Sequence, residues 1–426
     1  TDPLDRALVK AKDKVEIPAA TASAAAIVAI GEAGMALDLH KGDFEDLEPR
    51  VNAVMYTLDA IQTEKVAASP KLATWQRDAA LALKHSARVN RVRFIKEGKL
   101  IASAGEDRNV SFWDLSGKQL KQVATSSPVN DIAYSAPAIA LAAASNGSSV
   151  RVLRLGNFNQ MKVDAFERHS DSITAVEFSH GGEQIASASA DRTVRVFDSR
   201  SLAQRYFTSP PLPGIVTSVA FHPGDNLVVS GCDDGGVRLH TIDQPAVQLL
   251  GKFDAPARRP EFSPDGKLVV AASGDKTVRV WPIVSPHEIV NLPHPAPVTQ
   301  ATFRPVNEEG NYNFITCATN GEVRLIHLFK LTSDPPSTEN QVLEPRHAGP
   351  ALFATWSADG HWLATVGGGE VLVWEWQGDR PVARLRLTGL DAATSHAEFS
   401  PDAKMLATYG GDDTAYLWNL AKISTP

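Results

Sequence analysis

The sequence predicts an all-β fold, an eight-bladed β-propeller with a helical N-terminal segment, and two observations lead to it. First, the 12 residues SASADRTVRVFD at 187–198 return in altered form as VAASGDKTVRVWP and LIASAGEDRNVSFWDL. Second, the copies recur at intervals of 40 to 48 residues, a period that indicates stacked supersecondary units. The residues that end the eight copies, the anchors, are Trp113, Leu153, Phe197, His240, Trp281, Ile326, Trp374 and Trp418.

Each unit contains the pattern of short strands. In the first unit, VNRVRF, LIASA and VSFWDL alternate or are rich in β-branched residues, and AALALKH precedes them. Turn sequences such as SPDGK at 263–267 separate the strands. Four-stranded antiparallel units of this length close best as a propeller, in which every sheet packs on two neighbours.

The two ends of the repeat region predict how the ring closes. The last unit stops after its third strand, TAYLWNL at 414–420. We expect residues 79–85 to pair with 414–420 and so to leave no bare edge in a propeller spanning 79–426. Seven blades is the alternative, if the degenerate second or seventh unit is an insertion. Residues 1–78 lack the repeat and carry apolar residues at helical spacing, which predicts a helical segment.

The segments SADRTVRVFD, SGDKTVRVWP and GEDRNVSFWDL resemble WD repeats, and the resemblance covers residues 79–420. It implies that an Asp six positions before the anchor and an upstream His join a Ser or Thr and the Trp in a hydrogen-bond network within the blade. The matching residues are Asp107, Asp191, Asp234, Asp275 and Asp412, with His85, His169, His294 and His347. Gly147, Asn320 and Gly368 depart from the Asp pattern. Groups repeated once per blade are expected to stabilise it rather than to react.

Composition argues against several classes of partner and cofactor. The formal net charge is -7 and the pI is about 6.0, so neither nucleic acid nor a membrane surface is an expected partner. The only cysteines, Cys232 and Cys317, lie in apolar runs and are expected to be buried and inert, without a disulfide or a metal site. No cofactor is expected. The absence of a secretory signal favours the cytoplasm.

Candidate binding residues are those that vary at the starts of the inner strands and in nearby turns, where one mouth of the channel is expected. Arg258 and Arg259 in APARRPEF stand out, as do Leu352 and Phe353 two blades away, since an Arg pair facing an apolar pair is typical of a protein-binding hot spot. Phe353 as a core residue is the alternative. The other predicted contacts are Asn90, Asn130, Thr174, Thr217, Thr299, Ser395, Glu106 and Asp233.

The function predicted from these features is a non-catalytic scaffold or sensor domain that binds a protein partner on the propeller rim. The alternatives are a metal- or quinone-dependent channel enzyme, for which no converging carboxylates and His are found, and a nucleic-acid-binding propeller using the regularly placed Arg151, Arg195, Arg238, Arg279 and Arg324. The chain also resembles the C-terminal sensor region of prokaryotic STAND-type signalling NTPases. That resemblance implies a nucleotide-binding module outside this chain. Insertions at 307–313 and 332–341 mark a second candidate partner site at the opposite mouth.

Overall fold

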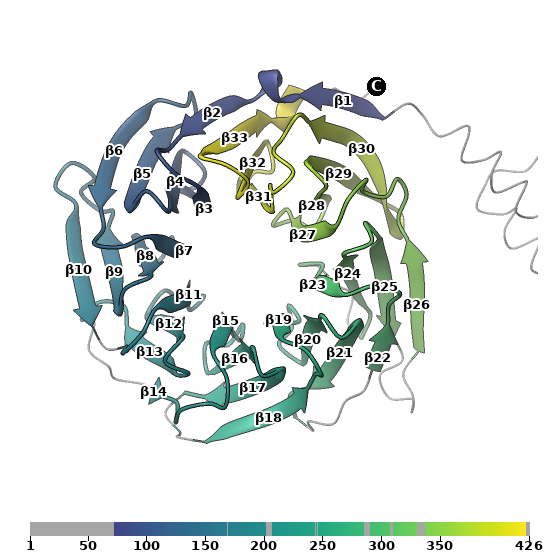
Figure 1. Cartoon of the computed structure of the whole chain (residues 1–426), viewed down its shortest axis with the longest axis horizontal. Coiled ribbons are helices and arrows are strands. Elements are labelled where there is room, and N and C mark those ends of the chain that lie inside the picture. Colours follow the sequence, from purple (N-terminus) through teal and green to yellow (C-terminus); the bar gives the residue numbers. More distant parts are fainter. Residues whose placement is uncertain are drawn as a thin grey trace, which may run out of the picture. The chain divides into compact units, whose positions relative to one another are not determined.

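A computed structural model describes residues 72–422, except 168, 202–206, 243, 245, 285–289, 307–309 and 330–336. Its strands form eight sheets arranged around a central axis (Figure 1). The prediction of an eight-bladed all-β propeller is confirmed. The seven-blade alternative is wrong, because the degenerate second and seventh units each form a complete sheet.

The first four blades each consist of four strands that follow one another in the chain. Blade 1 contains β3 (Val89–Ile95), β4 (Leu100–Gly105), β5 (Asn109–Asp114) and β6 (Gln119–Ala124). Blade 2 contains β7 (Val129–Ser135), β8 (Ala140–Ser145), β9 (Ser149–Arg154) and β10 (Lys162–Glu167). Blade 3 contains β11 (Ile173–Phe178), β12 (Gln184–Ser189), β13 (Val194–Asp198) and β14 (Phe207–Thr208). Blade 4 contains β15 (Val216–Phe221), β16 (Leu227–Cys232), β17 (Gly236–Thr241) and β18 (Val247–Lys252).

The remaining blades follow the same order, with additions from the start of the described chain in the last two. Blade 5 contains β19 (Ala257–Phe262), β20 (Leu268–Ser273), β21 (Thr277–Pro282) and β22 (Val290–Pro293). Blade 6 contains β23 (Val298–Phe303), β24 (Tyr312–Ala318), β25 (Val323–Phe329) and β26 (Ser337–Val342). Blade 7 contains β27 (Ala351–Trp356), β28 (Trp362–Gly367), β29 (Glu370–Gln377), β30 (Arg380–Thr388) and β1 (Ala73–Gln76). Blade 8 contains β31 (His396–Phe399), β32 (Met405–Tyr409), β33 (Thr414–Asn419) and β2 (Leu81–Lys84), and the short 3-10 helices are η1 (Arg77–Ala79) and η2 (Leu420–Lys422).

The outer strand of blade 8 comes from the opposite end of the repeat region. β2 pairs antiparallel with β33, with Leu81 opposite Leu417 and Lys84 opposite Thr414. The side chain of Leu83 is fully buried in a cluster shared by blades 8 and 1. This pairing gives β33 a partner on its outer side and joins the first and last blades.

The start of the described chain differs from the helical prediction. Residues 1–71 of the predicted helical segment lie outside the described residues. Residues 73–76 instead form β1, which pairs parallel with β30 as a fifth strand of blade 7. The open edge of β30 supplies backbone partners that an isolated short helix would lack, and Trp75 packs against the core between blades 7 and 8.

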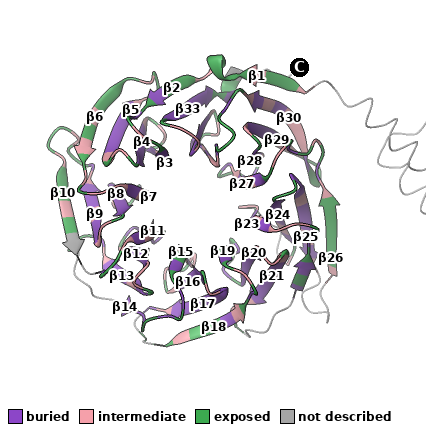
Figure 2. Ribbon diagram, in the orientation of Figure 1, coloured by how far each residue is buried: buried purple, intermediate pink, exposed green. Residues whose placement is uncertain are grey.

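The core lies between the blades. Each apolar cluster joins residues from neighbouring sheets, as where Phe112 of blade 1 packs with Ile132 and Leu141 of blade 2. The middle strands are almost fully buried, the inner strands are partly buried, and the outer strands β6, β18 and β26 are largely exposed (Figure 2). Burial of both sheet faces explains the near-continuous apolar runs of the middle strands.

The hydrogen-bond network implied by the resemblance is complete in blade 1. The His85 ring lies 2.8 Å from Asp107 through Nδ1 and 2.6 Å from Ser103 Oγ through Nε2. The indole of Trp113 donates to the same Ser103 oxygen at 2.7 Å. These buried polar groups satisfy one another, so the repeated His and Asp of this blade have a structural role.

Blade 7 keeps the His, Thr and Trp part of the network and places a different acid near the His, without a hydrogen bond between them. Glu370 follows two residues after Gly368, the residue that departs from the Asp pattern. Its carboxylate lies 3.4 Å from His347 Nδ1. The His347 ring and the Trp374 indole both contact Thr365 Oγ1, at 2.9 and 3.0 Å. The longer side chain reaches the position that the sequence pattern assigned to Asp.

Blade 5 leaves the network incomplete, which gives a testable prediction. The buried Trp281 N–H has no hydrogen-bond partner, because Ala271 stands where blade 1 has Ser103. The substitution Ala271→Ser should raise the free energy of unfolding by about 1 kcal/mol by supplying an acceptor. Denaturant unfolding measures the change.

A matched control is Ala143→Ser in blade 2, where the side chain of the anchor Leu153 has no N–H group that needs an acceptor. This variant should show no gain in stability. Equal effects of the two substitutions would contradict the explanation.

Candidate functional site

Two layers of side chains line the channel at the centre of the ring. We call the face where the innermost strands begin the top face and the face where they end the bottom face. The channel has a volume of about 770 Å³. The upper layer is Arg91, Asp131, Ala175, Ser218, Arg259, Gln300, Phe353 and His396. The lower layer is Arg93, Ala133, Glu177, Ala220, Glu261, Thr302, Thr355 and Glu398.

Four of the predicted contact residues at the top face tie neighbouring blades together. Each side chain donates to the first backbone carbonyl of the next inner strand, and all four are half-buried. The bonds join Asn90 to Val129 at 2.9 Å, Asn130 to Ile173 at 2.8 Å, Thr174 to Val216 at 2.6 Å and Thr299 to Ala351 at 2.7 Å. Small polar residues recur at this position because they join the blades.

The other predicted rim residues have different surroundings. Thr217 bonds within its own blade to the Gly231 carbonyl at 3.1 Å, and Ser395 lies 2.8 Å from its neighbour His396. Glu106 accepts a bond from Asn90 at 3.0 Å, which places this turn residue beside the start of β3. Four rim residues are exposed, and Leu352 is half-buried. The exposed four are Glu106, Thr217, Asp233 and Arg258.

The two adjacent arginines do not act as the surface pair that the sequence predicted. Arg258 is exposed at the start of β19, but a β-bulge follows it, and Arg259 has a positive φ of 38°. The Arg259 side chain therefore enters the channel, where Nη2 lies 2.6 Å from His396 Nε2. Its guanidinium carbon lies 5.1 Å from the centre of the Phe353 ring. The predicted Arg and Phe do meet, but inside the channel.

The channel also brings together four carboxylates, so the prediction that no acids converge there is wrong. Glu177 and Glu261 lie in the lower layer, and burial raises their pKa values to about 8 and about 7. Each channel carboxylate accepts a backbone N–H from the next blade. The bonds are Val176 N to Asp131 at 3.2 Å, Phe221 N to Glu177 at 3.1 Å, Phe94 N to Glu398 at 3.1 Å, and Phe303 N to Glu261.

The signal for these layers was present in the sequence. In NRVRF and RRPEF, charged residues occupy alternate positions of the inner strand, three and one before the aromatic. Alternate residues of a strand share one face, so these positions face the channel together. Most of the predicted rim residues instead stand four positions before the aromatic.

Potential metal ligands, the two cysteines and membrane-spanning helices are three further features with a bearing on function. No cluster of three or more potential metal ligands occurs among the described residues. Cys232 and Cys317 are buried and free, as predicted, and burial raises their pKa values to about 11 and about 12. In the described part of the chain, no helix has the length and apolar character needed to cross a bilayer.

Four of the five regularly placed arginines pair with acids of their own blades, so the five do not form the basic ring of the nucleic-acid alternative. Arg151 instead donates to the Ala124 carbonyl at 3.4 Å. The other four pair with an acid near the preceding turn: Arg195 with Asp191 at 4.0 Å, Arg238 with Asp234 at 2.6 Å, Arg279 with Asp275 at 3.8 Å and Arg324 with Glu322 at 2.8 Å.

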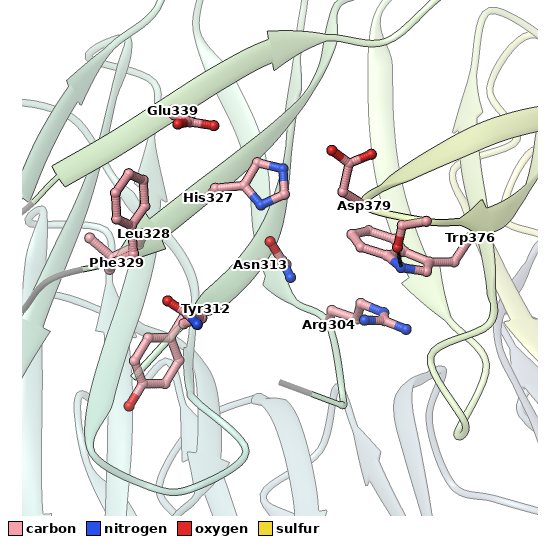
Figure 3. A pocket seen from close by; sticks show the side chains of 11 residues that line it. Arg304, Tyr312, Asn313, His327, Leu328, Phe329, Glu339, Trp376 and Asp379 are labelled. Atoms are coloured by element: carbon pink, nitrogen blue, oxygen red, sulfur yellow. Dashed lines mark hydrogen bonds between the residues drawn. The ribbon is translucent and has the colours of Figure 1, made fainter. Parts of the chain in front are cut away.

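A second cavity of about 360 Å³ lies on the bottom face between blades 6 and 7 (Figure 3). Its lining includes residues 311–313 and Glu339 from the two predicted insertions. The Arg304 guanidinium stacks on Trp376, with its carbon 4.0 Å from the ring centre. His327 and Asp379 come from different blades and lie on facing sides of the cavity. Residues 307–309 and 330–336 of the insertions are outside the described residues.

Comparison with known families decides the type of repeat. The family model described as "WD domain, G-beta repeat" matches residues 81–114, 160–198, 207–241 and 257–282. Four segments of the propeller therefore match the WD repeat. The matched segments carry four of the five Asp residues of the motif, Asp107, Asp191, Asp234 and Asp275.

Proteins similar to this chain include two from yeasts and one from a cyanobacterium. It is 29% identical over 208 residues to the target of rapamycin complex subunit wat1 of Schizosaccharomyces pombe, covering 47% of this chain and 64% of the relative. It is 28% identical to the subunit LST8 of Saccharomyces cerevisiae, covering 43% and 60%. An uncharacterised WD repeat-containing protein of Synechocystis is 35% identical over 32% of this chain and 38% of its own. The chain thus spans less than two thirds of the length of these relatives.

Proposed function

We propose that this WD-repeat propeller is a non-catalytic scaffold that binds a protein partner on its top face. The main support for the proposal is the role of the channel carboxylates. All four accept N–H bonds from the next blade, so they hold the ring together. Exposed polar and charged groups remain on the rim above them. Two relatives are named as subunits of a protein complex, which supports a role in assembly.

The contact surface proposed on the top face consists of Arg258, Thr217, Glu106, Asp233 and Leu352. Arg258 is central to it, because exposed arginine at a channel mouth can form charge-assisted bonds with a partner. The four residues that bond to the next blade are expected to set the shape of the rim.

The substitution Arg258→Glu tests the proposal by affinity capture of partners from the native host. Capture should fall at least about tenfold because a reversed charge repels the partner's acidic group, while the melting temperature stays unchanged. The control is Arg380→Glu, an exposed arginine at the start of β30 on the bottom face, which should capture normally. Retained capture by Arg258→Glu, or an equal loss in the control, would remove the top face from consideration.

Two finer predictions stay within this proposal. The first is a sensor role like that of STAND-type signalling NTPases, with a nucleotide-binding module outside this chain. It requires that the full-length protein oligomerises only with ligand and that deletion of residues 79–420 alters this behaviour. The second is a cytoplasmic location, which fractionation of the native host tests.

A further inference from the structure

Arg259 places a positive charge in the upper layer of the channel without a carboxylate in contact with it. It forms no ion pair with any residue in the described ranges, whereas Arg91 lies 2.7 Å from Asp131 and Arg93 pairs with Glu398. The nearest polar partner of Arg259 is the imidazole of His396. Of the two guanidinium groups in the upper layer, Arg91 has an ion-pair partner and Arg259 has none among the described residues.

His396 holds Arg259 in place but does not neutralise it. Its Nε2 can accept from Arg259 only when the ring is neutral, and burial together with the nearby arginines keeps the pKa of His396 well below its ordinary value. Ser395 Oγ lies 2.8 Å from the other ring nitrogen, Nδ1. Phe353 packs against both the guanidinium and the imidazole, at 5.1 and 4.8 Å between centres.

The backbone conformation also directs the Arg259 side chain into the channel. A non-glycine residue with φ of 38°, followed by Pro260 in a bulge, is held in a sparsely populated conformation. The stacked ring and the imidazole acceptor leave the remaining guanidinium N–H groups available toward the channel. Burial and the neighbouring Arg91 lower the pKa of Arg259 to about 10, so an anion beside it would stabilise its charged form.

We propose that the upper layer of the channel binds a carboxylate side chain from an acidic peptide segment of the partner, with Arg259 as its anchor. This inference rests on the proposed function and adds the chemistry of the partner. Guanidinium binds carboxylate through two parallel N–H bonds, and the Arg259 side chain already lines the channel. A peptide is favoured over a free acid because the exposed Arg258 directly precedes Arg259 on the rim and can contact residues that flank the inserted side chain.

The test measures binding of the full chain to two fluorescein-labelled peptides, GSGDEEGSG and its neutral counterpart GSGNQQGSG. The wild-type protein should prefer the acidic peptide, and Arg259→Gln should weaken that binding about 10- to 100-fold, as expected for a charge-assisted bond. Arg304→Gln is the control, since it removes another aromatic-stacked arginine, on the bottom face, and should bind like the wild type.

The outcomes separate this inference from the function on which it rests. Equal binding of both peptides by the wild type overturns the inference. This comparison does not depend on whether Arg259→Gln folds. Unchanged binding by folded Arg259→Gln also overturns it. Succinate that binds as tightly as the acidic peptide would assign the site to a free carboxylate instead. Loss of capture by Arg258→Glu without any peptide preference would leave the scaffold function intact and reject only the anchor.

Discussion

Aspartate in place of Leu83 should open the ring. At moderate temperature the variant propeller should then no longer unfold in one cooperative transition. Leu83 is fully buried on β2, the strand that joins blade 8 to blade 1, among Val89, Trp113 and Leu417. An unpaired buried charge costs about 3–5 kcal/mol, and the lost apolar contacts add to it. This is a large part of the 5–15 kcal/mol that is about typical for a domain. Circular dichroism against denaturant measures the loss.

The matched control lies two residues earlier on the same strand. Leu81 is 42% exposed, so Leu81→Asp keeps its charge in water and should change the free energy of unfolding by less than about 1 kcal/mol. If the two aspartate variants unfold alike, residues 81–84 do not close the ring.

Alanine in place of Asp131 should destabilise the propeller by about 3 kcal/mol. The Asp131 carboxylate pairs with Arg91 at 2.7 Å and accepts the Val176 N–H at 3.2 Å, so it joins blades 1, 2 and 3. Its removal leaves a guanidinium and an N–H group without their partner in a largely buried place. The midpoint of chemical unfolding is the measurement.

Ser218 provides the comparison, because it occupies the same upper-layer position in blade 4. Its hydroxyl is buried without a hydrogen-bond partner. Ser218→Ala should leave stability unchanged or slightly higher. A loss from Asp131→Ala no larger than that from Ser218→Ala would show that the channel charges do not hold the blades.

The architecture could be predicted because it depends on a repeated pattern. Eight anchors at a regular interval require eight similar units, and the three strands of the last unit indicate an outer strand taken from elsewhere. The structure pairs β2 with β33 in this way. The strand at residues 73–76 was not predictable, because four residues carry little periodicity and their partner, the edge of β30, is more than 300 residues away.

The candidate site was harder to predict, for a physical reason. Arg258 and Arg259 are adjacent in the sequence, and a bulge separates their directions, so one lies on the rim and the other in the channel. The contact of Arg259 with His396 joins residues 137 positions apart. Asn90 and Thr174 looked like free rim residues because the carbonyls that they bind belong to the next blade.

Hydrogen–deuterium exchange on the captured complex tests the central claim, that the partner docks on the top face of an inert ring. Binding should slow exchange in residues 86–91, 255–259 and 348–353, around the start of the inner strands, and leave the bottom face unchanged. Slower exchange confined to residues 303–306, 311–313 and 376–380 would place the partner at the bottom cavity and contradict the account.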